Sequence, residues 1–222
     1  MSIVLVISPH PDDETLGCGG TLLRHRTEND EVHWLIMTTI SEKAGYSHDR
    51  VVSRKKEIEN VASIYGFASV CQTDFITTQL DEVPKNKLVN EVSIVINMVK
   101  PDTVYVPFRN DVHSDHEAVF DAVASCTKSF RYPSIRRVRA YETLSETEFC
   151  IRPDAAGFKP NLWVDISDHL EEKIDIMQIY TGEMDEHPFP RSERNIRALA
   201  TLRGATAGVD AAESFISLKE IV

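Results

Sequence analysis

The strongest constraint on the fold is a run of five aliphatic residues, Ile3–Ile7, with a dense polar cluster directly behind it. The run has no polar alternation, so it predicts a strand buried on both faces of a parallel sheet. The polar residues of the first cluster (residues 9–14) are His10, Asp12, Asp13 and Glu14. Ligands of open α/β sheets bind at the carboxyl ends of the strands. Three carboxylates crowded at such an end predict a site where a cation or a catalytic task balances their charge.

Two simpler interpretations of this stretch are weaker. Acidic residues often cap a helix, and capping would explain Glu14. Capping does not explain two adjacent aspartates or a histidine between two prolines. The glycines that follow, Gly17, Gly19 and Gly20, resemble part of a dinucleotide-binding loop, but Leu22 stands where the third glycine of that fingerprint belongs. The preceding acids would also repel a pyrophosphate. We therefore expect these glycines to permit close helix packing.

Composition indicates one ordinary globular domain. A chain of 222 residues is long enough for a sizeable core, and no compositional break marks a second domain, so residues 1–222 are expected to form one unit. No apolar run has the length of a membrane span and no secretory signal is visible, which predicts a cytoplasmic protein. The net charge of −11 disfavours nucleic acid and anionic membranes as partners and suits a small or neutral substrate. The four cysteines show no Cys-x-x-Cys spacing, so we expect buried thiols and neither a zinc knuckle nor a disulfide framework.

Strand and helix patterns alternate along the first half of the chain. The expected elements are a helix over 21–26, a strand over 32–36, a helix over 51–65, a strand over 69–72, a helix between Pro84 and Pro101, a strand over 103–106 and an alanine-rich helix over 117–125. This alternation predicts an α/β fold with a three-layer, Rossmann-like, mostly parallel sheet. The site is expected at the C-terminal ends of its strands.

A second cluster (residues 107–116) follows the strand expected at 103–106 and reads Pro-Phe-Arg-Asn-Asp-Val-His-Ser-Asp-His. The order of strand, acid- and histidine-rich loop and helix thus occurs twice, and parallel strands place both clusters at one sheet edge. His113 and His116 are close enough for one turn to present both on one side. Two histidines and a carboxylate with an open position for water are the pattern of a hydrolytic zinc site.

The pattern is looser beyond this point. Strands are expected over 137–144, 161–166 and 215–222, and helices over 167–180 and 191–200. Ser167 or Asp168 is the expected N-cap of the first of these helices. The polar segments 40–50 and 181–191 are expected to be loops beside a pocket. His187, in the second loop, is most simply a surface histidine.

Together the two clusters resemble the LmbE/PIG-L family of zinc-dependent N-acetylglucosamine deacetylases. The marks of that family are Pro-His-Pro-Asp-Asp-Glu after the first strand, here Pro9–Glu14, and a later His-x-Asp-His, here His113–His116. The resemblance extends over nearly the whole chain. It includes Arg54 with Glu57 and the closing Ala-Glu-Ser-Phe at Ala212–Phe215.

The resemblance implies a division of roles within the clusters. The implied ligands of one divalent ion, zinc with Fe²⁺ or Co²⁺ as substitutes, are His10, Asp13 and His116. Asp12 is implied as the general base, His113 as the oxyanion-stabilising group or acid, and Asp115 as the residue that orients a histidine. Such a division suits amide hydrolysis, since a carboxylate that is not a ligand can take a proton from water whose pKa the metal lowers to about 7. The sequence alone does not decide which of Asp12 and Asp13 binds the metal.

The resemblance also implies the reaction and its substrate. The implied enzyme is a hydrolase that cleaves the N-acetyl amide of an N-acetylglucosamine-type sugar or glycoside and releases acetate and a free amine. Arg54 and Arg109 are implied as substrate contacts, for which a guanidinium fork is suited, and a homo-oligomer is left open. The alternatives are a metal-dependent phosphoesterase, which usually needs more ligands for two metals, and a metal-binding module without turnover.

Overall fold

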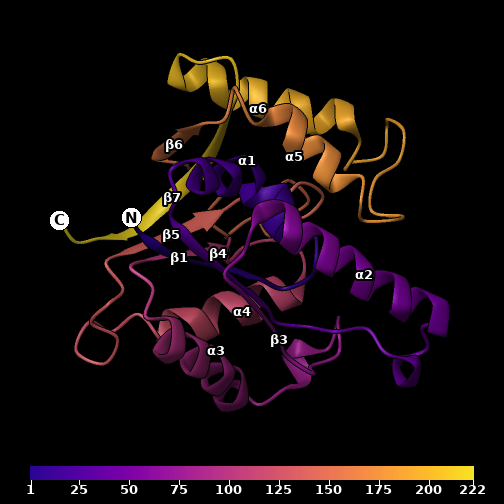
Figure 1. Cartoon of the computed structure of the whole chain (residues 1–222), viewed down its shortest axis with the longest axis vertical. Helices are drawn as coiled ribbons and strands as arrows, with labels where there is room; N and C mark the ends of the chain where they lie inside the picture. The colour runs from indigo at the N-terminus through magenta and orange to yellow at the C-terminus, as the bar shows by residue number, and fades with distance from the viewer.

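The first strand, β1 (Ile3–Ser8), lies inside a seven-stranded sheet of order β3-β2-β1-β4-β5-β7-β6 (Figure 1). This is a computed structural model, and it describes residues 1–222. The other strands are β2 (Glu31–Ile36), β3 (Ser69–Gln72), β4 (Thr103–Pro107), β5 (Arg137–Tyr141), β6 (Leu162–Asp165) and β7 (Ala212–Glu220). Strands β1 to β5 pair in parallel, and β7 is antiparallel to both of its neighbours. The predicted mostly parallel α/β sheet is confirmed.

Helices cover both faces of the sheet (Figure 1). One face carries α1 (Asp13–Thr27), α2 (His48–Tyr65), α5 (Leu170–Met177) and α6 (Glu193–Ala207), and the other carries α3 (Lys85–Val99) and α4 (Ser114–Ser125). Two single 3₁₀ turns lie at Glu42–Ala44 and Leu80–Glu82. Val4 and Val6 of β1 pack into the first core, whereas Leu5 and Ile7 pack into the second. Because alternate residues serve opposite cores, β1 has to be an uninterrupted aliphatic run.

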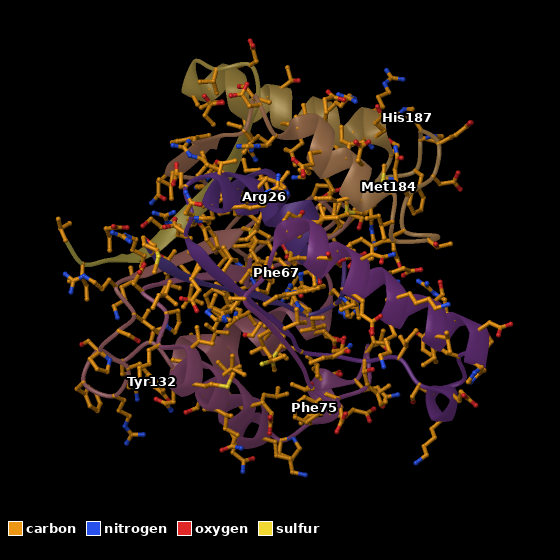
Figure 2. All side chains as sticks on the ribbon, in the orientation of Figure 1. Arg26, Phe67, Phe75, Tyr132, Met184 and His187 are labelled. Carbon is orange, nitrogen blue, oxygen red and sulfur yellow. The ribbon has the colours of Figure 1, made fainter.

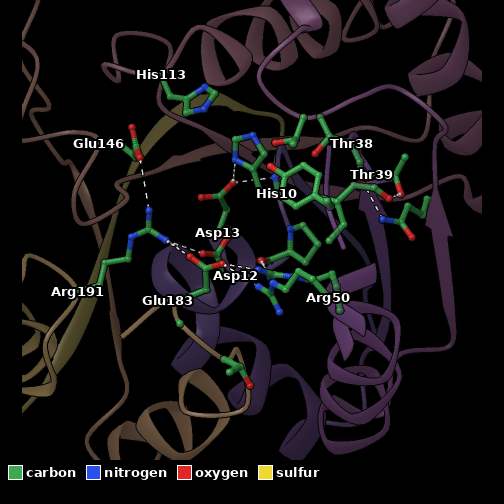
Figure 3. A pocket seen from close by; sticks show the side chains of 18 residues that line it. His10, Asp12, Asp13, Thr38, Thr39, Arg50, His113, Glu146, Glu183 and Arg191 are labelled. Atoms are coloured by element: carbon green, nitrogen blue, oxygen red, sulfur yellow. Dashed lines mark hydrogen bonds and ion pairs between the residues drawn. The ribbon is translucent and has the colours of Figure 1, made fainter. Parts of the chain in front are cut away.

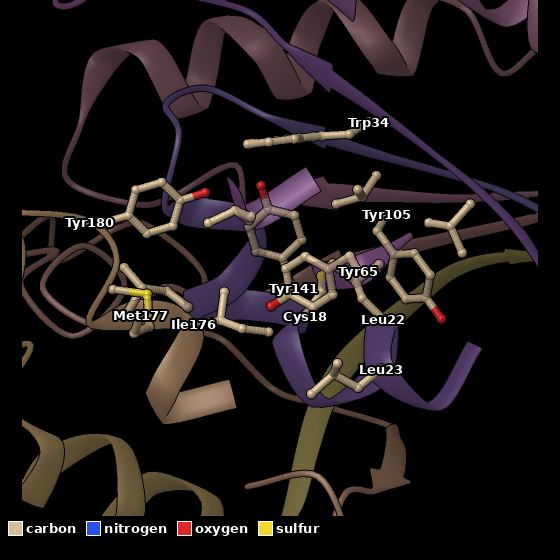
Figure 4. Close-up of a cluster of buried hydrophobic side chains, with 14 of the residues drawn as sticks. Cys18, Leu22, Leu23, Trp34, Tyr65, Tyr105, Tyr141, Ile176, Met177 and Tyr180 are labelled. Carbon is tan, nitrogen blue, oxygen red and sulfur yellow. The ribbon is translucent and has the colours of Figure 1, made fainter. Parts of the chain in front are cut away.

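Large aromatic side chains fill the first core (Figure 4), and the polar atoms of two of them fix the end of β1. Trp34 Nε1 donates to Ser8 Oγ at 2.8 Å, and the Tyr141 hydroxyl donates to the Ile7 carbonyl at 2.9 Å. Each hydrogen bond satisfies a buried donor that would otherwise be costly. The end of β1 is therefore held from two sides just before the first cluster begins.

The sheet topology places both clusters in one crevice. From β1 the chain proceeds to β2 and β3 on one side and then returns to β4 on the other side of β1. The carboxyl ends of the strands at such a switch point form the usual ligand-binding crevice of a doubly wound sheet. The first cluster follows β1 and the second follows β4, so the expected meeting of the two clusters is confirmed.

Several helices begin earlier than predicted, and in α1 and α4 this is because cluster residues form the first turn. Helix α1 starts at Asp13 instead of residue 21, α4 at Ser114 instead of residue 117, and α2 at His48, within the predicted loop. Helix α5 starts at Leu170 with His169 as N-cap, so the predicted N-cap was wrong. Ser167 is held instead in a turn, with its hydroxyl donating to Asp165 Oδ1 at 2.6 Å. Beyond the predicted limits, α6 runs on to Ala207 and β7 begins at Ala212.

The glycines of the first stretch lie inside α1 and are packing positions, as predicted. A Cβ at Gly17 would lie 2.2 Å from Cδ2 of Tyr141, and one at Gly20 would lie 2.7 Å from Cβ of Ile166. The N–H of Gly20 donates to Glu213 of the closing motif at 2.9 Å. Glycine is thus required by neighbouring side chains, and the segment forms no dinucleotide loop.

Two remaining expectations concern the thiols and the helices. All four cysteines are free, but only Cys18 and Cys126 are buried, while Cys71 and Cys150 are partly exposed. The expectation of buried thiols is therefore half right. None of the helices combines the length and the apolar character needed to span a bilayer.

Candidate metal centre and active site

Three side chains from the two clusters converge at the switch point. His10, Asp13 and His116 present ligand atoms that all lie within 4.8 Å of one another. Asp13 Oδ2 is 3.2 Å from His10 Nδ1 and 3.4 Å from His116 Nε2. Asp13 and His116 are buried, and the His10 side chain is 18% exposed. The structure thus brings together the three residues that the resemblance implies as metal ligands.

The two histidines are oriented in the manner of metal ligands. His116 Nδ1 lies 2.8 Å from Asp111 Oδ2, while its buried Nε2 has no hydrogen-bond partner. His10 Nε2 lies 3.0 Å from Asp115 Oδ2, which leaves Nδ1 beside Asp13. A metal-binding histidine usually donates its other ring N–H to a carboxylate, and an orphaned buried nitrogen is otherwise costly. Two imidazoles and one carboxylate fit zinc or a similar first-row ion.

The pKa values of Asp13 and His10 also suit a metal site. Burial alone would raise the pKa of Asp13, but His116 and His10 outweigh it and hold that pKa well below its ordinary value. Burial alone would lower the pKa of His10, but hydrogen bonds to Asp115 and Asp13 raise it to about 9. Without a metal, protons on the imidazoles balance the carboxylates. A divalent ion held by His10, Asp13 and His116 would take over that role and displace the protons.

Asp12 is adjacent to Asp13 in the chain but has a separate set of partners. Its Oδ2 accepts a hydrogen bond from Arg191 Nη1 at 2.7 Å, and its Oδ1 receives none from the protein (Figure 3). Burial raises the pKa of Asp12 well above its ordinary value, the charge of Asp13 adds to this rise, and Arg191 opposes it. Asp12 therefore combines a raised proton affinity with one free oxygen, as a general base requires.

His113 is a neutral hydrogen-bond donor. As N-cap of α4 its Nδ1 accepts the backbone N–H of Asp115 at 3.1 Å. Burial, with the charge of His10, lowers the pKa of His113 to about 4, so the ring is neutral near pH 7. A neutral ring that accepts at Nδ1 carries its proton on Nε2. That N–H is available to a developing negative charge.

His10, Asp12, Asp13 and His113 lie on the wall of a pocket of about 400 Å³ (Figure 3). The predicted flanking segments both contribute to it, the first through Ile40, Tyr46 and Arg50 and the second through Thr181, Gly182, Glu183 and Arg191. Nearly all of the lining residues are polar or charged. Such a lining fits a ligand rich in hydrogen-bonding groups, since buried polar groups need partners.

The two arginines predicted as substrate contacts have different environments. Arg54 lines the pocket, but its guanidinium is engaged by the Pro11 carbonyl at 2.7 Å, by Glu57 and by Glu183. Arg109 does not line the pocket. Its side chain is 43% exposed and forms ion pairs of 2.8 Å with Glu117 and with Asp121, both on α4. The structure therefore gives no support to Arg109 as a substrate contact in this pocket.

Sequence reasoning missed several residues of the site. Arg191, Glu183 and Glu146 line the pocket but belong to no motif. Asp111 lies inside the second motif, yet its part in orienting His116 was not predicted. The signal that could have found Arg191 is its place in a polar loop expected beside the pocket. His187, in that same loop, is exposed and lies at the periphery of the molecule (Figure 2).

Comparison with known proteins agrees with this geometry. The sequence profile of the GlcNAc-PI de-N-acetylase (PIG-L) family matches residues 5–127, which is more than half of the chain. The chain belongs to this family. The diacetylchitobiose deacetylase of Thermococcus kodakarensis is 27% identical to this PIG-L family protein over an alignment of 218 positions, which covers 92% of this chain and 79% of the relative. The relatives with a named substrate are deacetylases of N-acetylglucosamine-type compounds, which are hydrolases of amide bonds.

Solved structures show how widely this fold is used. The N,N'-diacetylchitobiose deacetylase of Pyrococcus horikoshii superposes with a TM-score of 0.77 at 24% identity, covering 97% of this chain and 83% of its own. The 4-carboxy-2-hydroxymuconate hydratase of Pseudomonas putida superposes with a TM-score of 0.73 at 19% identity, covering 100% of this chain and 98% of its own. At these identities both likenesses establish the fold alone. A hydratase shares it, so the reaction has to be argued from the site.

Proposed function

We propose that this PIG-L family protein is a metal-dependent hydrolase that removes the N-acetyl group from an N-acetylglucosamine-type sugar or glycoside. One observation carries the proposal: the orphaned Nε2 of His116 lies with His10 and Asp13 beside a second carboxylate, Asp12, that is not part of the set. When bound, a divalent ion, preferably zinc, supplies Lewis acidity to water and to the amide carbonyl. The named relatives among deacetylases support the choice of amide over other substrates.

Asp12 moves the protons in this mechanism. Its free Oδ1 accepts a proton from the attacking water, while Arg191 holds Oδ2 and so fixes the direction of the carboxylate. The same carboxyl then returns that proton to the nitrogen of the departing amine. One water is consumed, the amide C–N bond breaks, and acetate and a free amine leave. A positioned proton acceptor of this kind typically contributes about 10²- to 10⁴-fold in rate.

His113 stabilises the carbonyl oxygen as negative charge develops on it. Its ring is neutral near pH 7 because burial lowers its pKa to about 4, and its proton lies on Nε2. A prearranged neutral donor strengthens its hydrogen bond as the oxyanion forms, which is the transition-state preference that catalysis needs. We therefore assign His113 the oxyanion role and leave proton transfer to Asp12.

The substrate assignment follows from the pocket and the relatives together. A polar lining favours a sugar, whose hydroxyls need partners when buried. The positive groups of the pocket do not favour an anion, because Arg50, Arg54 and Arg191 are each paired with a carboxylate of the protein. A neutral acetamido sugar fits this balance better than a phosphate ester does.

The test combines turnover with metal content. The protein is freed of metal with a chelator and reloaded with Zn²⁺, Fe²⁺ or Co²⁺. Acetate and free amine are then assayed in parallel with N-acetylglucosamine, its disaccharide and several N-acetylglucosaminides. We expect equal amounts of both products, no turnover without metal, and one bound ion per chain. Phosphate ester turnover without deacetylation would instead favour the phosphoesterase alternative.

A matched pair of histidine variants tests the ligand set. His116→Ala should lose bound metal, whereas His187→Ala, which removes an exposed histidine outside the pocket, should retain it. The measurement is elemental analysis of both variants after identical purification. Wild-type metal content in His116→Ala would contradict the proposed centre.

A further inference from the structure

Glu14 is a buried carboxylate that the proposed chemistry does not use. It has no accessible surface, and the groups that donate hydrogen bonds to it are neutral. Three donors point at it. Thr15 Oγ1 and the Tyr180 hydroxyl each donate to Oε1 at 2.6 Å, and the backbone N–H of Asp12 donates to Oε2 at 3.0 Å. The last contact connects Glu14 directly to the backbone of the proposed base.

The backbone of Asp12 is in a conformation that residues other than glycine rarely adopt. Asp12 has φ 130° and ψ −31°, although it is not a glycine. Such strain persists only where the surroundings over-determine it, and it concentrates at functional sites. The Asp12 carbonyl is held by the N–H groups of Thr15 and Leu16 at 3.0 and 2.8 Å, in the first turn of α1. Glu14 accepts the N–H of Asp12, so both backbone hydrogen-bonding groups of Asp12 are fixed.

Tyr180 extends this support to a distant part of the chain. It is buried in the first core just beyond α5 (Figure 4), and its hydroxyl donates to Glu14 Oε1. Tyr180 directly precedes the 181–191 segment, whose last residue, Arg191, holds the Asp12 carboxylate. The residue just before the segment therefore supports the backbone of Asp12 through Glu14, and the last residue of the segment supports the Asp12 side chain.

From this geometry we infer that Glu14 is a positioning residue for Asp12. Its Oε2 keeps the Asp12 peptide in the strained conformation that turns the carboxylate toward Arg191 and the pocket, away from the ligand set of Asp13. Tyr180 keeps Glu14 in place. The inference rests on the proposed role of Asp12 as base. It differs from ordinary helix capping, which would affect stability and leave the turnover of the folded protein unchanged.

A conservative and a disruptive variant separate the two roles. In Glu14→Gln the amide oxygen can still accept the Asp12 N–H, while the two hydroxyls rotate to accept from its NH₂ group. In Glu14→Leu no acceptor remains. We expect kcat within about threefold of wild type for Glu14→Gln and a fall of roughly 10- to 100-fold for Glu14→Leu, less than the loss of a whole general base. KM and metal content should remain close to wild type in both.

The control is a second buried carboxylate, Glu213 of β7, that contacts the backbone of the same helix. Glu213 accepts the N–H groups of Gly20 and Thr21 at 2.9 and 2.8 Å and pairs with Lys173, outside the pocket. Glu213→Gln should lower the melting temperature without lowering the kcat of the folded protein. If Glu14→Leu behaves like this control, Glu14 is only a cap and the inference is overturned. If Glu14→Gln is as slow as Glu14→Leu, its charge acts and not its hydrogen bond, which also overturns it.

A structural readout separates this inference from the proposed function. Crystal structures of the variants should show Asp12 at negative φ in Glu14→Leu and near the wild-type value in Glu14→Gln. If Glu14→Leu does not fold, Glu14→Asp takes its place, since the shorter side chain cannot reach both Asp12 and Tyr180. An unchanged φ in the disruptive variant contradicts positioning even if the enzyme deacetylates sugars. A wild-type protein without deacetylase activity contradicts the proposed function even if φ relaxes as expected.

Discussion

The two clusters face each other across one crevice but are held in different ways. The second cluster contains much of its own support: His116 meets Asp111 at 2.8 Å, and the Asp115 N–H donates to His113 at 3.1 Å. Its backbone is ordinary, with His113 at φ −77° and ψ 126° as the N-cap of α4. The motif that carries the histidines thus also carries the groups that orient them.

The first cluster depends on residues far along the chain. The Pro11 carbonyl is bound by Arg54, 43 positions away, and the Asp12 carboxylate by Arg191, 179 positions away. Its backbone is strained at Asp12, where φ is 130°. Strain of this kind costs about 1–3 kcal/mol and requires outside contacts to maintain it. The difference teaches that the second cluster is held largely by local contacts, whereas the geometry of Asp12, the proposed base, depends on tertiary contacts.

Replacing the base should have the largest effect. Asp12→Asn keeps the shape of the side chain but removes the proton acceptor, so kcat should fall about 10²- to 10⁴-fold with metal content unchanged. Asp13→Asn should instead weaken metal binding, because it changes a ligand. Steady-state kinetics with elemental analysis of both variants checks this. If Asp12→Asn loses metal and Asp13→Asn does not, the roles of the two neighbours have to be exchanged.

Removing the distant support of the base should have the next largest effect. In Arg191→Gln the charge-assisted hydrogen bond to Asp12 is lost, and since such bonds contribute about 1.5–3 kcal/mol, kcat/KM should fall roughly 10- to 100-fold near neutral pH. The direction in which the kcat/KM profile should shift with pH follows from the pKa of Asp12. Arg191 opposes the rise in the pKa of Asp12, so its loss raises that pKa further. A base works only when deprotonated, and the acid limb of the kcat/KM profile should therefore move to higher pH.

Arg194→Gln is the matched control for this variant. Arg194 is an exposed arginine in the same region and does not line the pocket. Its pH–rate profile should coincide with that of wild type. An unshifted profile in Arg191→Gln would mean that the first cluster does not depend on its distant partner, and the contrast between the clusters would be lost.

Much of the fold, and the convergence of the three proposed metal ligands, was predictable because the determining residues are contiguous. Ile3–Ile7 alone indicates a doubly buried strand, and each cluster directly follows a strand, so the parallel topology brings them together. The contacts of Arg191 with Asp12 and of Tyr180 with Glu14 were not predictable. They depend on how a segment from the last quarter of the chain packs against the first quarter, and local sequence patterns do not encode that packing.

Motif membership was also a poor guide to the arginines. Arg109 lies within the second motif but pairs with α4 on the surface, whereas Arg191 lies outside every motif and contacts Asp12, the proposed base. Likewise, the helix starts were misplaced because acidic residues such as Asp13 serve at once as helix residues and as site residues. A residue type indicates which chemistry is possible, but the contacts of that residue in the fold decide whether it takes part in the site.

In the second cluster, removing a local support should act on the metal more than on turnover. Asp111→Ala leaves His116 without the acceptor of its Nδ1–H, and loss of such an outer partner typically lowers metal affinity about 10- to 100-fold. The kcat of the fully loaded variant should change only a few-fold. Competition with a chromogenic chelator measures the affinity. Asp121→Ala, an acid on α4 outside the pocket, should bind metal like wild type, and equal affinity in both variants would remove the argument for local support.

The smallest effect is expected for the arginine inside the second motif. Arg109 is 43% exposed, and both of its ion pairs are with residues of α4 at the surface, where such pairs contribute about 0–1 kcal/mol. Arg109→Gln should therefore change kcat/KM less than about twofold and lower the free energy of unfolding by at most about 1 kcal/mol. Assaying Arg109→Gln beside Arg191→Gln with the same acetamido sugar compares an arginine within a motif with an arginine outside any motif. A larger kcat/KM loss in Arg109→Gln would show that substrate reaches the α4 surface, and the pocket wall would then have to be extended beyond the residues that now line it.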